Sequence, residues 1–582
     1  MVRNLIAFVI VGIMAVCLGF FCFDEIALFN LYRKYALYFI AVAFSFWIFS
    51  LIKAFLNLNE NDNNIICAEH KHLLVRFFSF HKVAIVLSVL LMVFAVVLCR
   101  PDFRILSDET SILSLSQSIY ESKEPLVYCS TINNFNGGTE VLSCFLDKRP
   151  IFFPFLVSII HSAVGYKPEN IFVFNFCSSV IALFLFYYLI HLKYGRFWGI
   201  CGMVCLSAYP LFIIFANSAG FEVFNLTCSL LLFLFAYNYL VKPDALRGEI
   251  LLSWLPLISQ SRYESVLSVF IFLPLFFYKL PKSEYAKLSY KFYVFPLLFL
   301  PIAWQRMAVD NAAAWQVDSL EDSFGLKWLI INAQKAFEFF FFGIEYYGVI
   351  SFLSFFALIG LYFLIKEVSV NTKSNSLRPV CITVFLFYLL HAVSRFVYSL
   401  ADLTEVLERR LGIIFLPMIV YLAIVFLVQL NNKIRQHKIY YSVLCAFLLF
   451  FNWSDTANLS CVRDLPSFWK FKKCREYLND NYSNKNDFLI MTTCPNNYAP
   501  LGYNSISFGD YNKYNEDIKR FISSKKNFII ISFQYLYPDT HEPNRECILP
   551  EGLTAETVLE EQFGSRVLVR ISKCCLKPED TD

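Results

Sequence analysis

Long apolar runs constrain this 582-residue chain more than any other feature. A helix needs about 20 predominantly apolar residues to cross a bilayer, and about thirteen runs reach or approach that length. Only 16% of the residues are charged, whereas about a quarter are charged in a typical soluble domain. The sequence therefore predicts an α-helical polytopic membrane protein. The runs cover residues 4–23, 35–56, 83–99, 171–192, 197–215, 222–241, 249–260, 264–278, 292–306, 346–365, 380–399, 410–430 and 439–452.

Basic loops orient these runs. If the N-terminus is cytoplasmic and the chain reverses direction at each run, every cytoplasmic loop contains Lys or Arg, as the positive-inside rule requires. The six loops are 57–82, 193–196, 242–248, 279–291, 366–379 and 431–438. This orientation places residues 100–170, the neighbourhood of 261–263, residues 307–345 and the tail from about Trp453 outside the cytoplasm.

The outer segment 100–170 is predicted to be structured. Residues 111–120 have a helical pattern, and residues 151–165 form a short apolar run that contains proline. If this run were a span, the basic loop at Lys193 would lie outside, against the positive-inside rule. We therefore predict that 151–165 is an interfacial or re-entrant helix.

The tail changes character after the last apolar run. Strand patterns at 487–492, 505–508, 527–533 and 566–571 alternate with helical patterns at 468–479, 514–523 and 554–562, which is typical of a small α/β domain. The tail contains neither the dinucleotide-binding motif G-x-G-x-x-G nor the phosphate-binding motif G-x-x-x-x-G-K-[ST], so a nucleotide site is unsupported. We expect three regions: a two-helix extension with a cytoplasmic loop (1–82), a membrane core (83–452) and an extracytoplasmic α/β domain (453–582).

Cysteine and histidine residues show no metal-ligand spacing. A disulfide such as Cys129 to Cys144 is compatible with an oxidising space, and buried thiols are the alternative. His161 and His391 lie in apolar runs, and we interpret them as core histidines with satisfied ring nitrogens. Eight of the 18 cysteines fall on the predicted outer side: Cys129, Cys144, Cys461, Cys474, Cys494, Cys547, Cys574 and Cys575.

Two adjacent carboxylates, Asp108 and Glu109, follow the third apolar run on the predicted outer side. Such a pair could accept a proton from an acceptor hydroxyl or hold a divalent cation. The structural alternative is a helix start, because Ser107 is a good N-cap residue and acidic side chains are favoured in a first helical turn.

Charged residues on the same side form a second set of candidates. A guanidinium group at headgroup depth can bind a lipid phosphate through two parallel hydrogen bonds. Ionisable residues between two apolar runs are costly and usually functional. The alternatives are snorkelling anchors and, for Arg262 with Glu264, a mutual ion pair. The candidates are Lys148, Arg149, Arg262, Glu264, Arg409 and Arg410, with Glu222 as a weaker one.

In order and sidedness these residues resemble the GT-C superfamily of polytopic glycosyltransferases, in particular the protein O-mannosyltransferases and aminoarabinose (lipid A) transferases. The resemblance covers roughly residues 83–452, and the sequence departs from the family pattern at Tyr263, where proline is common. The carrying motifs are Asp108-Glu109, Arg149-Pro150 before Phe-Pro-Phe-Leu, Ser261-Arg262-Tyr263-Glu264, and Arg409-Arg410 with Pro417.

The resemblance implies transfer of a sugar from a polyprenyl-phosphate donor to an extracytoplasmic lipid, glycan or protein acceptor, usually with inversion. It implies that Asp108 is the general base and that Glu109 supports it or orients the sugar. Arg149, helped by Arg262 or Arg409, would neutralise the leaving phosphate. No cofactor follows from the resemblance, and a divalent cation at the acidic pair stays open.

Two other functions use the same features. A transporter or flippase of lipid-linked sugars would bind the phosphate without breaking a bond, although the hydropathy pattern shows no internal repeat. A scaffold or polymerase subunit would work through its outer tail. The formal charge of +4 argues against a nucleic-acid partner. We expect a bacterial inner membrane with a periplasmic tail, although Asn452, Asn458 and Asn481 begin triplets that would be glycosylated in an endoplasmic reticulum.

Overall fold

The computed structural model describes residues 2–57, 68–133, 139–309, 324–343, 351–370, 377–405, 408–434, 438–456, 466–523, 528–537, 540, 547–563 and 567–576. The chain divides into two units. The membrane unit comprises Met1–Asp102, Lys148–Phe153 and Phe172–Ser460, and the sheet unit comprises Phe103–Asp147, Pro154–Ile171 and Cys461–Asp582. The boundary passes through helix α5 (Phe152–Val164).

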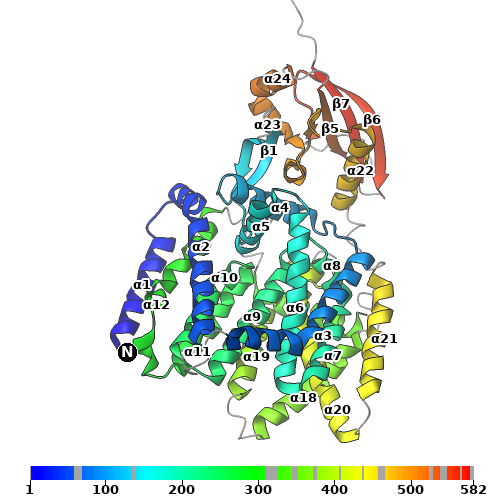
Figure 1. The fold of residues 1–582 in the computed structure, drawn as a ribbon. Coiled ribbons are helices and arrows are strands. Elements are labelled where there is room, and N and C mark those ends of the chain that lie inside the picture. Colours follow the sequence, from blue (N-terminus) through cyan, green and yellow to red (C-terminus); the bar gives the residue numbers. More distant parts are fainter. Residues whose placement is uncertain are drawn as a thin grey trace, which may run out of the picture. The chain divides into compact units, whose positions relative to one another are not determined.

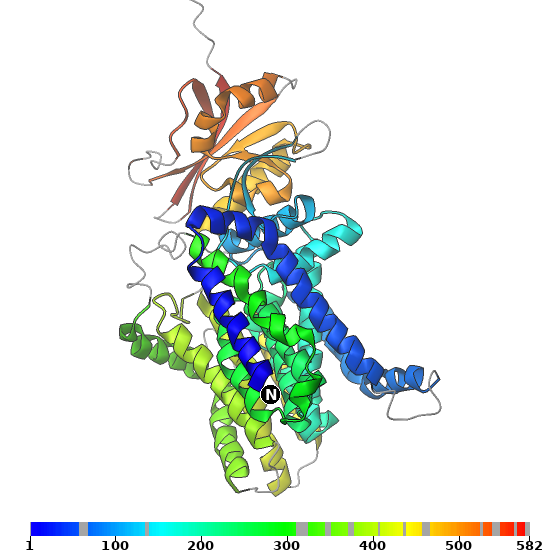
Figure 2. The same cartoon turned by 90° about the vertical axis from the view of Figure 1, so that its left-hand side faces the viewer.

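The membrane unit is helical in its described part (Figures 1 and 2). Its long apolar helices carry Phe and Leu on most faces, as expected for segments that contact lipid. Its elements are α1 (Val2–Phe20), α2 (Glu25–Asn57), α3 (Ala68–Leu98), α6 (Asn170–Tyr194), α7 (Arg196–Ser207), α8 (Pro210–Ala216), α9 (Glu222–Val241), α10 (Ala245–Ser259), η1 (Tyr263–Ser268), α11 (Val269–Lys279), η2 (Glu284–Lys287), α12 (Tyr290–Val294), η3 (Phe295–Phe299), α13 (Leu300–Ala308), α16 (Leu326–Phe337), η4 (Glu338–Phe342), α18 (Phe352–Val370), α19 (Leu377–Phe396), η6 (Glu408–Phe415), α20 (Leu416–Ile434) and α21 (Lys438–Thr456).

Seven helices in the described part of the chain are long and apolar enough to cross a membrane, or eight if the bent pair α7 and α8 is one broken span. This confirms a multi-pass membrane protein, whereas the expected count of about thirteen is not confirmed. The seven are Glu25–Leu56, Val75–Leu98, Asn170–Tyr194, Glu222–Val241, Phe352–Ser369, Arg378–Phe396 and Glu408–Lys433.

Proline accounts for part of the difference between the expected and observed spans. The stretch between α10 and α13 forms a series of short α and 3-10 helices rather than three uniform spans. Pro256 and Pro274 lie inside α10 and α11, and prolines open η3 and α13. A proline inside a helix removes one backbone donor and clashes with the preceding turn. The expected run 346–365 begins in residues outside the described part.

The sheet unit is built around one seven-stranded sheet with the order β2-β1-β4-β3-β5-β7-β6. Strands β3, β4 and β5 are parallel neighbours, and the remaining pairs are antiparallel. The elements are α4 (Leu106–Glu121), β1 (Val127–Asn133), β2 (Thr139–Phe145), α22 (Pro466–Asn481), β3 (Phe488–Met491), η8 (Pro495–Asn497), η9 (Ala499–Leu501), β4 (Asn504–Ile506), α23 (Phe508–Lys513), α24 (Asn515–Ser523), β5 (Ile529–Leu536), β6 (Leu553–Phe563) and β7 (Val567–Leu576).

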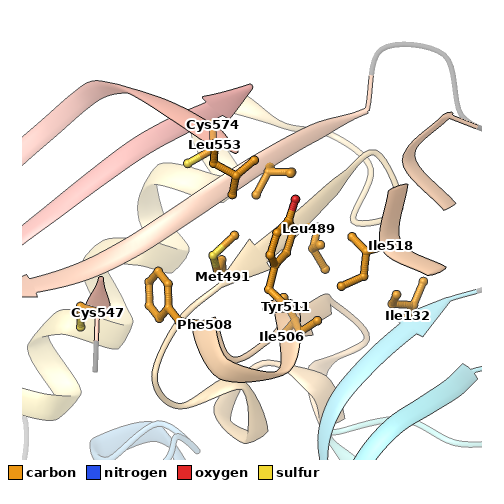
Figure 3. Packing of buried hydrophobic residues seen from close by; sticks show 11 residues of the cluster. Ile132, Leu489, Met491, Ile506, Phe508, Tyr511, Ile518, Cys547, Leu553 and Cys574 are labelled. Atoms are coloured by element: carbon orange, nitrogen blue, oxygen red, sulfur yellow. The ribbon is translucent and has the colours of Figure 1, made fainter. Parts of the chain in front are cut away.

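Two strands of this sheet come from the outer segment and five from the tail. Strand β1 pairs with β2 on one side and, through Thr131 and Ser505, with β4 of the tail on the other. Figures 1 and 2 show the cyan strand β1 beside the orange elements of the tail. Ile132 of β1 belongs to the same buried cluster as Leu489, Ile506 and Ile518 of the tail (Figure 3). The outer segment and the tail therefore share one hydrophobic core.

The sequence prediction is wrong about the secondary structure of one segment of the tail. Residues 554–562 were expected to be helical, but they lie in strand β6, which pairs with β7 along its length. The segment contains three Glu residues with one Ala, one Leu and one Gln, all of which favour helices. Pairing overrides that weak preference, because Glu560 lies opposite Arg570 and accepts a hydrogen bond from its Nε at 2.8 Å.

The suggested disulfide between Cys129 and Cys144 is not formed, and both residues are thiols. In the β1–β2 ladder Cys144 lies opposite Tyr128, and a register shift between Tyr128 and Ser130 takes Cys129 out of the regular pairing. Such a bulge leaves the extra residue without a direct cross-strand neighbour. Cys461 lies outside the described residues.

Candidate functional site

Glu109 anchors the start of helix α4 in the sheet unit. Its side chain is buried, and its carboxylate accepts hydrogen bonds from the backbone N–H groups of Arg104 at 2.9 Å and Ile105 at 3.2 Å. Ile105 is the N-cap of α4 and Arg104 precedes it, so the carboxylate reaches back over the helix start much as the acidic residue of a capping box does. Glu109 therefore orders the loop that leads into α4, and its carboxylate is already engaged by the backbone.

Asp108 has a different environment from its neighbour. Its side chain is only half-buried, whereas Glu109 is 1% exposed. The expected N-cap role of Ser107 is wrong, because the N-cap is Ile105 and Ser107 lies inside the helix. Of the pair, Asp108 is therefore the more exposed carboxylate.

The membrane unit gathers charged side chains from the ends of four helical elements. Arg262, just before η1, forms an ion pair with Glu264 at 2.9 Å from Nε to Oε1. Its Nη1 lies 3.7 Å from Oε1 of Glu222, at the start of α9, and Nη1 of Arg410 in η6 lies 3.6 Å from the same oxygen. The expected pairing of Arg262 with Glu264 is confirmed, and Glu222 and Arg410 join them.

Arg395, in the last turn of α19, completes this group. Its Nη2 donates to Oε1 of Glu264, and its Nη1 donates to the carbonyl oxygen of Leu411 in η6. The side chains of Arg262 and Arg395 are each 6% exposed and that of Glu222 is 3% exposed. We call the five residues Glu222, Arg262, Glu264, Arg395 and Arg410 the arginine cluster.

Helix ends and a buried amide hold the arginine cluster in place. A carboxylate at the start of α9 and a guanidinium group at the end of α19 are both favoured by the helix dipole. Asn225, one turn after Glu222, accepts hydrogen bonds from the hydroxyl groups of Ser261 and Ser265 at 2.7 Å each. These bonds tie the turn that bears Arg262 to helix α9.

The segment at Arg149 is attached to the same turn. The backbone N–H of Phe152 donates to the carbonyl oxygen of Gln260 at 3.1 Å, and Gln305 donates to the carbonyl oxygen of Arg149 at 2.8 Å. Arg149 is 7% exposed. The structure therefore brings the backbone at Arg149 to the turn before Arg262, two positions that are 113 residues apart in the sequence.

Two other candidates, Lys148 and Arg409, are not members of the arginine cluster. Lys148 is half-buried. Arg409 donates from Nη2 to the carbonyl oxygen of Thr404 at 3.2 Å, within its own loop. The neighbouring arginine, Arg410, is the one whose ion pair with Glu222 joins it to the arginine cluster.

The two histidines differ from each other. His161 is a satisfied core group, as expected: Asn170 donates to Nδ1 at 2.9 Å, and Nε2 lies 3.2 Å from the hydroxyl of Ser116. Burial lowers the pKa of His161 to about 4, so the ring is neutral. For His391 the expectation is wrong, because neither ring nitrogen has a hydrogen-bond partner in the described part of the chain, although the residue is 1% exposed.

Sequence reasoning missed Arg395 and undervalued His391. Both lie within the expected span 380–399, one helical turn apart on α19. Ionisable residues inside an apolar run are expensive and usually face a cavity or each other. If that rule is applied to the interior of the apolar run 380–399 as well as to its ends, it identifies both His391 and Arg395 as candidate site residues.

The arginine cluster combines charges of both signs. It contains three guanidinium groups and two carboxylates, a formal charge of +1 for the five residues, in a largely buried setting. Burying ion pairs rarely stabilises a protein more than apolar packing does, because desolvation offsets the attraction. A buried group of charged residues of this kind is therefore a candidate binding site. Among the described residues, no group of three His, Cys, Asp or Glu could hold a metal ion.

Gly220 offers a direct test of the geometry around Glu222. A Cβ atom at residue 220 would lie 2.1 Å from Oε2 of Glu222. We expect Gly220→Ala to displace that carboxylate from Arg262 and Arg410, and to lower the unfolding temperature in detergent, since charge-assisted hydrogen bonds would lose their alignment. Gly12→Ala is the control, because a Cβ there meets nothing within 4 Å. An unfolding temperature in Gly220→Ala equal to that of the wild type would contradict the geometry.

Comparisons with known proteins support the fold. No protein-family model matches the sequence, and no curated protein matches it. The structure is similar to ArnT from Cupriavidus metallidurans bound to undecaprenyl phosphate, with 9% sequence identity, a TM-score of 0.52, and coverage of 85% of this chain and 98% of ArnT. The apo state of ArnT is similar as well, with 10% sequence identity, a TM-score of 0.50, and coverage of 87% of this chain and 98% of ArnT. The chain therefore shares the fold of ArnT, and the resemblance noted in the sequence is confirmed at the level of the fold.

Proposed function

We propose that this protein is a membrane glycosyltransferase that moves a sugar from a polyprenyl-phosphate donor to an acceptor outside the cytoplasm. The observation that carries this proposal is the arginine cluster, in which three largely buried guanidinium groups meet at the ends of helices of the membrane unit. A donor phosphate attached to a lipid arrives at headgroup depth. Fixed cations at that depth stabilise the negative charge that develops as the sugar leaves.

The ArnT structure supports the choice of a lipid phosphate. ArnT shares the fold over 98% of its length and was solved with undecaprenyl phosphate bound. In this chain, Arg262 and Arg395 are the groups best placed to receive the phosphate. An ion pair with Glu264 fixes each guanidinium group, and each side chain is buried away from most of the competing water. Arg149 and Arg410 supply further positive charge, and His391 offers ring nitrogens that no described residue occupies.

Asp108 is proposed as the general base. The acceptor hydroxyl attacks the anomeric carbon of the sugar, its proton passes to Asp108, and the bond from that carbon to the phosphate oxygen breaks. Attack on the face opposite the phosphate inverts the anomeric centre. A carboxylate that abstracts a proton must be reachable by the acceptor, and Asp108 is more exposed than Glu109. Glu109 is proposed as the residue that supports Asp108 by ordering the start of α4.

The membrane is proposed to be a bacterial inner membrane, with the sheet unit in the periplasm. The basic loops support this orientation under the positive-inside rule. The ArnT used in the comparison comes from a bacterium. A lipid, a glycan and a protein all stay open as acceptors, because each presents a hydroxyl or amine nucleophile.

The direct test uses purified protein and labelled donors. Wild-type protein in nanodiscs is expected to consume a radiolabelled undecaprenyl-phosphate sugar when membrane extract supplies the acceptor. Arg262→Gln is expected to weaken binding of undecaprenyl phosphate about tenfold or more, because charge-assisted hydrogen bonds contribute about 1.5–3 kcal/mol each. Arg247→Gln is the matched control, because Arg247 pairs with Asp244 at the start of α10, on the side expected to be cytoplasmic.

Two outcomes would contradict the proposal. Equal binding by the wild type and Arg262→Gln would remove the arginine cluster as the phosphate site. Binding of the lipid phosphate without consumption of any donor would favour the alternative function, a transporter or flippase of lipid-linked sugars, since that function needs the same cations and no bond cleavage.

A further inference from the structure

The outer segment and the tail meet at a narrow seam in the sheet. Strands β1 and β4 are joined through the single register pair Thr131 and Ser505. Most strand pairs in this sheet have longer ladders, such as β5 with β7. A short ladder contributes few backbone hydrogen bonds. Side chains must therefore provide much of the attachment.

A carboxylate from the tail reinforces this seam. Oδ2 of Asp510, in α23, accepts hydrogen bonds from the hydroxyl groups of Ser130 at 2.6 Å and Ser143 at 2.7 Å. Ser130 lies in β1 and Ser143 in β2, so one carboxylate holds both strands of the hairpin. Burial alone would raise the pKa of Asp510, but these hydrogen bonds and that of Ser507 outweigh it and lower the pKa. The Asp510 carboxyl group is therefore ionised at neutral pH.

A second contact reaches the helix that carries Asp108. The hydroxyl group of Thr110 lies 2.8 Å from Oδ1 of Asn497 and 2.7 Å from the carbonyl oxygen of Leu106, so these two acceptors share its one hydrogen. The side chains of Thr110 and Asn497 are both buried. Thr110 is two residues after Asp108 on α4, while Asn497 closes η8 in the tail. The turn of η8 is in turn fixed to β4, because Ser505 donates to the carbonyl oxygen of Pro495 at 3.0 Å. Asn496 adds a longer contact to Ser111 at 3.5 Å.

We infer that the tail acts as a positioning element for the proposed base, with Asn497 as the positioning residue that holds α4 through Thr110. This inference rests on the proposed function for Asp108. It adds a role for Asn497, which is 387 residues from Thr110 in the sequence. The physical reason is that a base must be held within a few tenths of an ångström of its productive position. A buried hydrogen bond one half-turn from Asp108 restricts the rotation and translation of α4.

The test compares two variants that remove the contact between Thr110 and Asn497 from opposite sides. Thr110→Val also removes the contact with the carbonyl oxygen of Leu106, which Asn497→Ala keeps. Asn497→Ala and Thr110→Val are each expected to raise hydrogen exchange of the α4 amides, residues 106–121, about tenfold in full-length protein in nanodiscs, because a buried partner is left without its hydrogen bond. With labelled undecaprenyl-phosphate mannose, glucose and aminoarabinose as donors, kcat is expected to fall about tenfold with an unchanged donor KM. Thr110→Ser keeps the hydroxyl group and is expected to restore both readouts.

Gln534→Leu is the matched control for loss of a buried hydrogen bond within the tail. Gln534 is 4% exposed and donates to the carbonyl oxygen of Cys547 at 2.8 Å, both in the tail. It is expected to lower the unfolding temperature without a selective change in α4 exchange. The inference is overturned if α4 exchange is unchanged in Asn497→Ala and Thr110→Val, or if Gln534→Leu raises it equally. A rise in acceptor KM with α4 still protected would also overturn it, in favour of a tail that binds acceptor.

The hydrogen-exchange readout separates this inference from the proposed function. It needs no donor and no acceptor, so it reports on Asn497 even if the wild type transfers none of the sugars. Failure of the wild type to consume any donor would contradict the proposed function alone. Loss of kcat in Asn497→Ala without any change in α4 exchange would contradict the positioning role alone.

Discussion

Asp108→Asn is expected to lower the rate of sugar transfer about 10²- to 10⁴-fold, the range that a positioned general base typically contributes. The amide keeps the size of the side chain but cannot accept the proton of the acceptor hydroxyl at neutral pH. Glu109 accepts hydrogen bonds from two backbone N–H groups at the start of α4 and is unchanged in this variant, so expression and the unfolding temperature are expected to stay close to those of the wild type. The measurement is single-turnover transfer from a labelled undecaprenyl-phosphate sugar.

Glu121→Gln is the matched control for that substitution. It makes the same chemical change in the last turn of the same helix, where Glu121 accepts a hydrogen bond from Gln117 at 2.9 Å. Transfer by Glu121→Gln is expected to remain near the wild-type rate. A wild-type rate in Asp108→Asn would remove Asp108 as the base, and an equal loss in both variants would point to damage to α4.

Arg395→Leu is expected to destabilise the protein by about 3–5 kcal/mol, the usual result of removing one partner from a buried ion pair. Arg395 donates to both Glu264 and the carbonyl oxygen of Leu411, so the substitution leaves two buried acceptors with fewer donors. The unfolding temperature in detergent, followed by intrinsic fluorescence, measures the effect. Binding of undecaprenyl phosphate is expected to weaken as well, because the charge of the arginine cluster falls from one to zero.

The double variant Arg395→Leu with Glu264→Leu separates stability from binding. Removing both partners eliminates the buried carboxylate that lost its donor, so part of the stability is expected to return. Arg262 keeps Glu222 as an ion-pair partner in this variant. Binding is expected to stay weak, because two groups of the phosphate site are gone. An unfolding temperature in Arg395→Leu equal to that of the wild type would contradict the buried ion pair.

Local sequence was sufficient for the membrane character and for much of the arginine cluster. Hydropathy depends on composition over about 20 residues, and charge asymmetry between loops depends on composition alone. Arg262 and Glu264 could be selected because they interrupt apolar runs, and their pairing is a contact between residues two positions apart. The GT-C resemblance rested on the order of short motifs, and the structure confirms it as a fold.

Tertiary structure decided what depends on distant partners. Arg395 meets Glu264 across 131 residues, and Asp510 clamps Ser130 across 380. Strand β6 has helix-forming residues and becomes a strand only because β7 pairs with it. The hairpin β1–β2 joins the tail sheet because Ile132 buries its side chain with Leu489 and Ile506. The sequence by itself determined the class of protein and the side on which charges gather, because these follow from local composition. Which charges meet, and which strands share a sheet, follows from packing free energies summed over residues far apart in the chain.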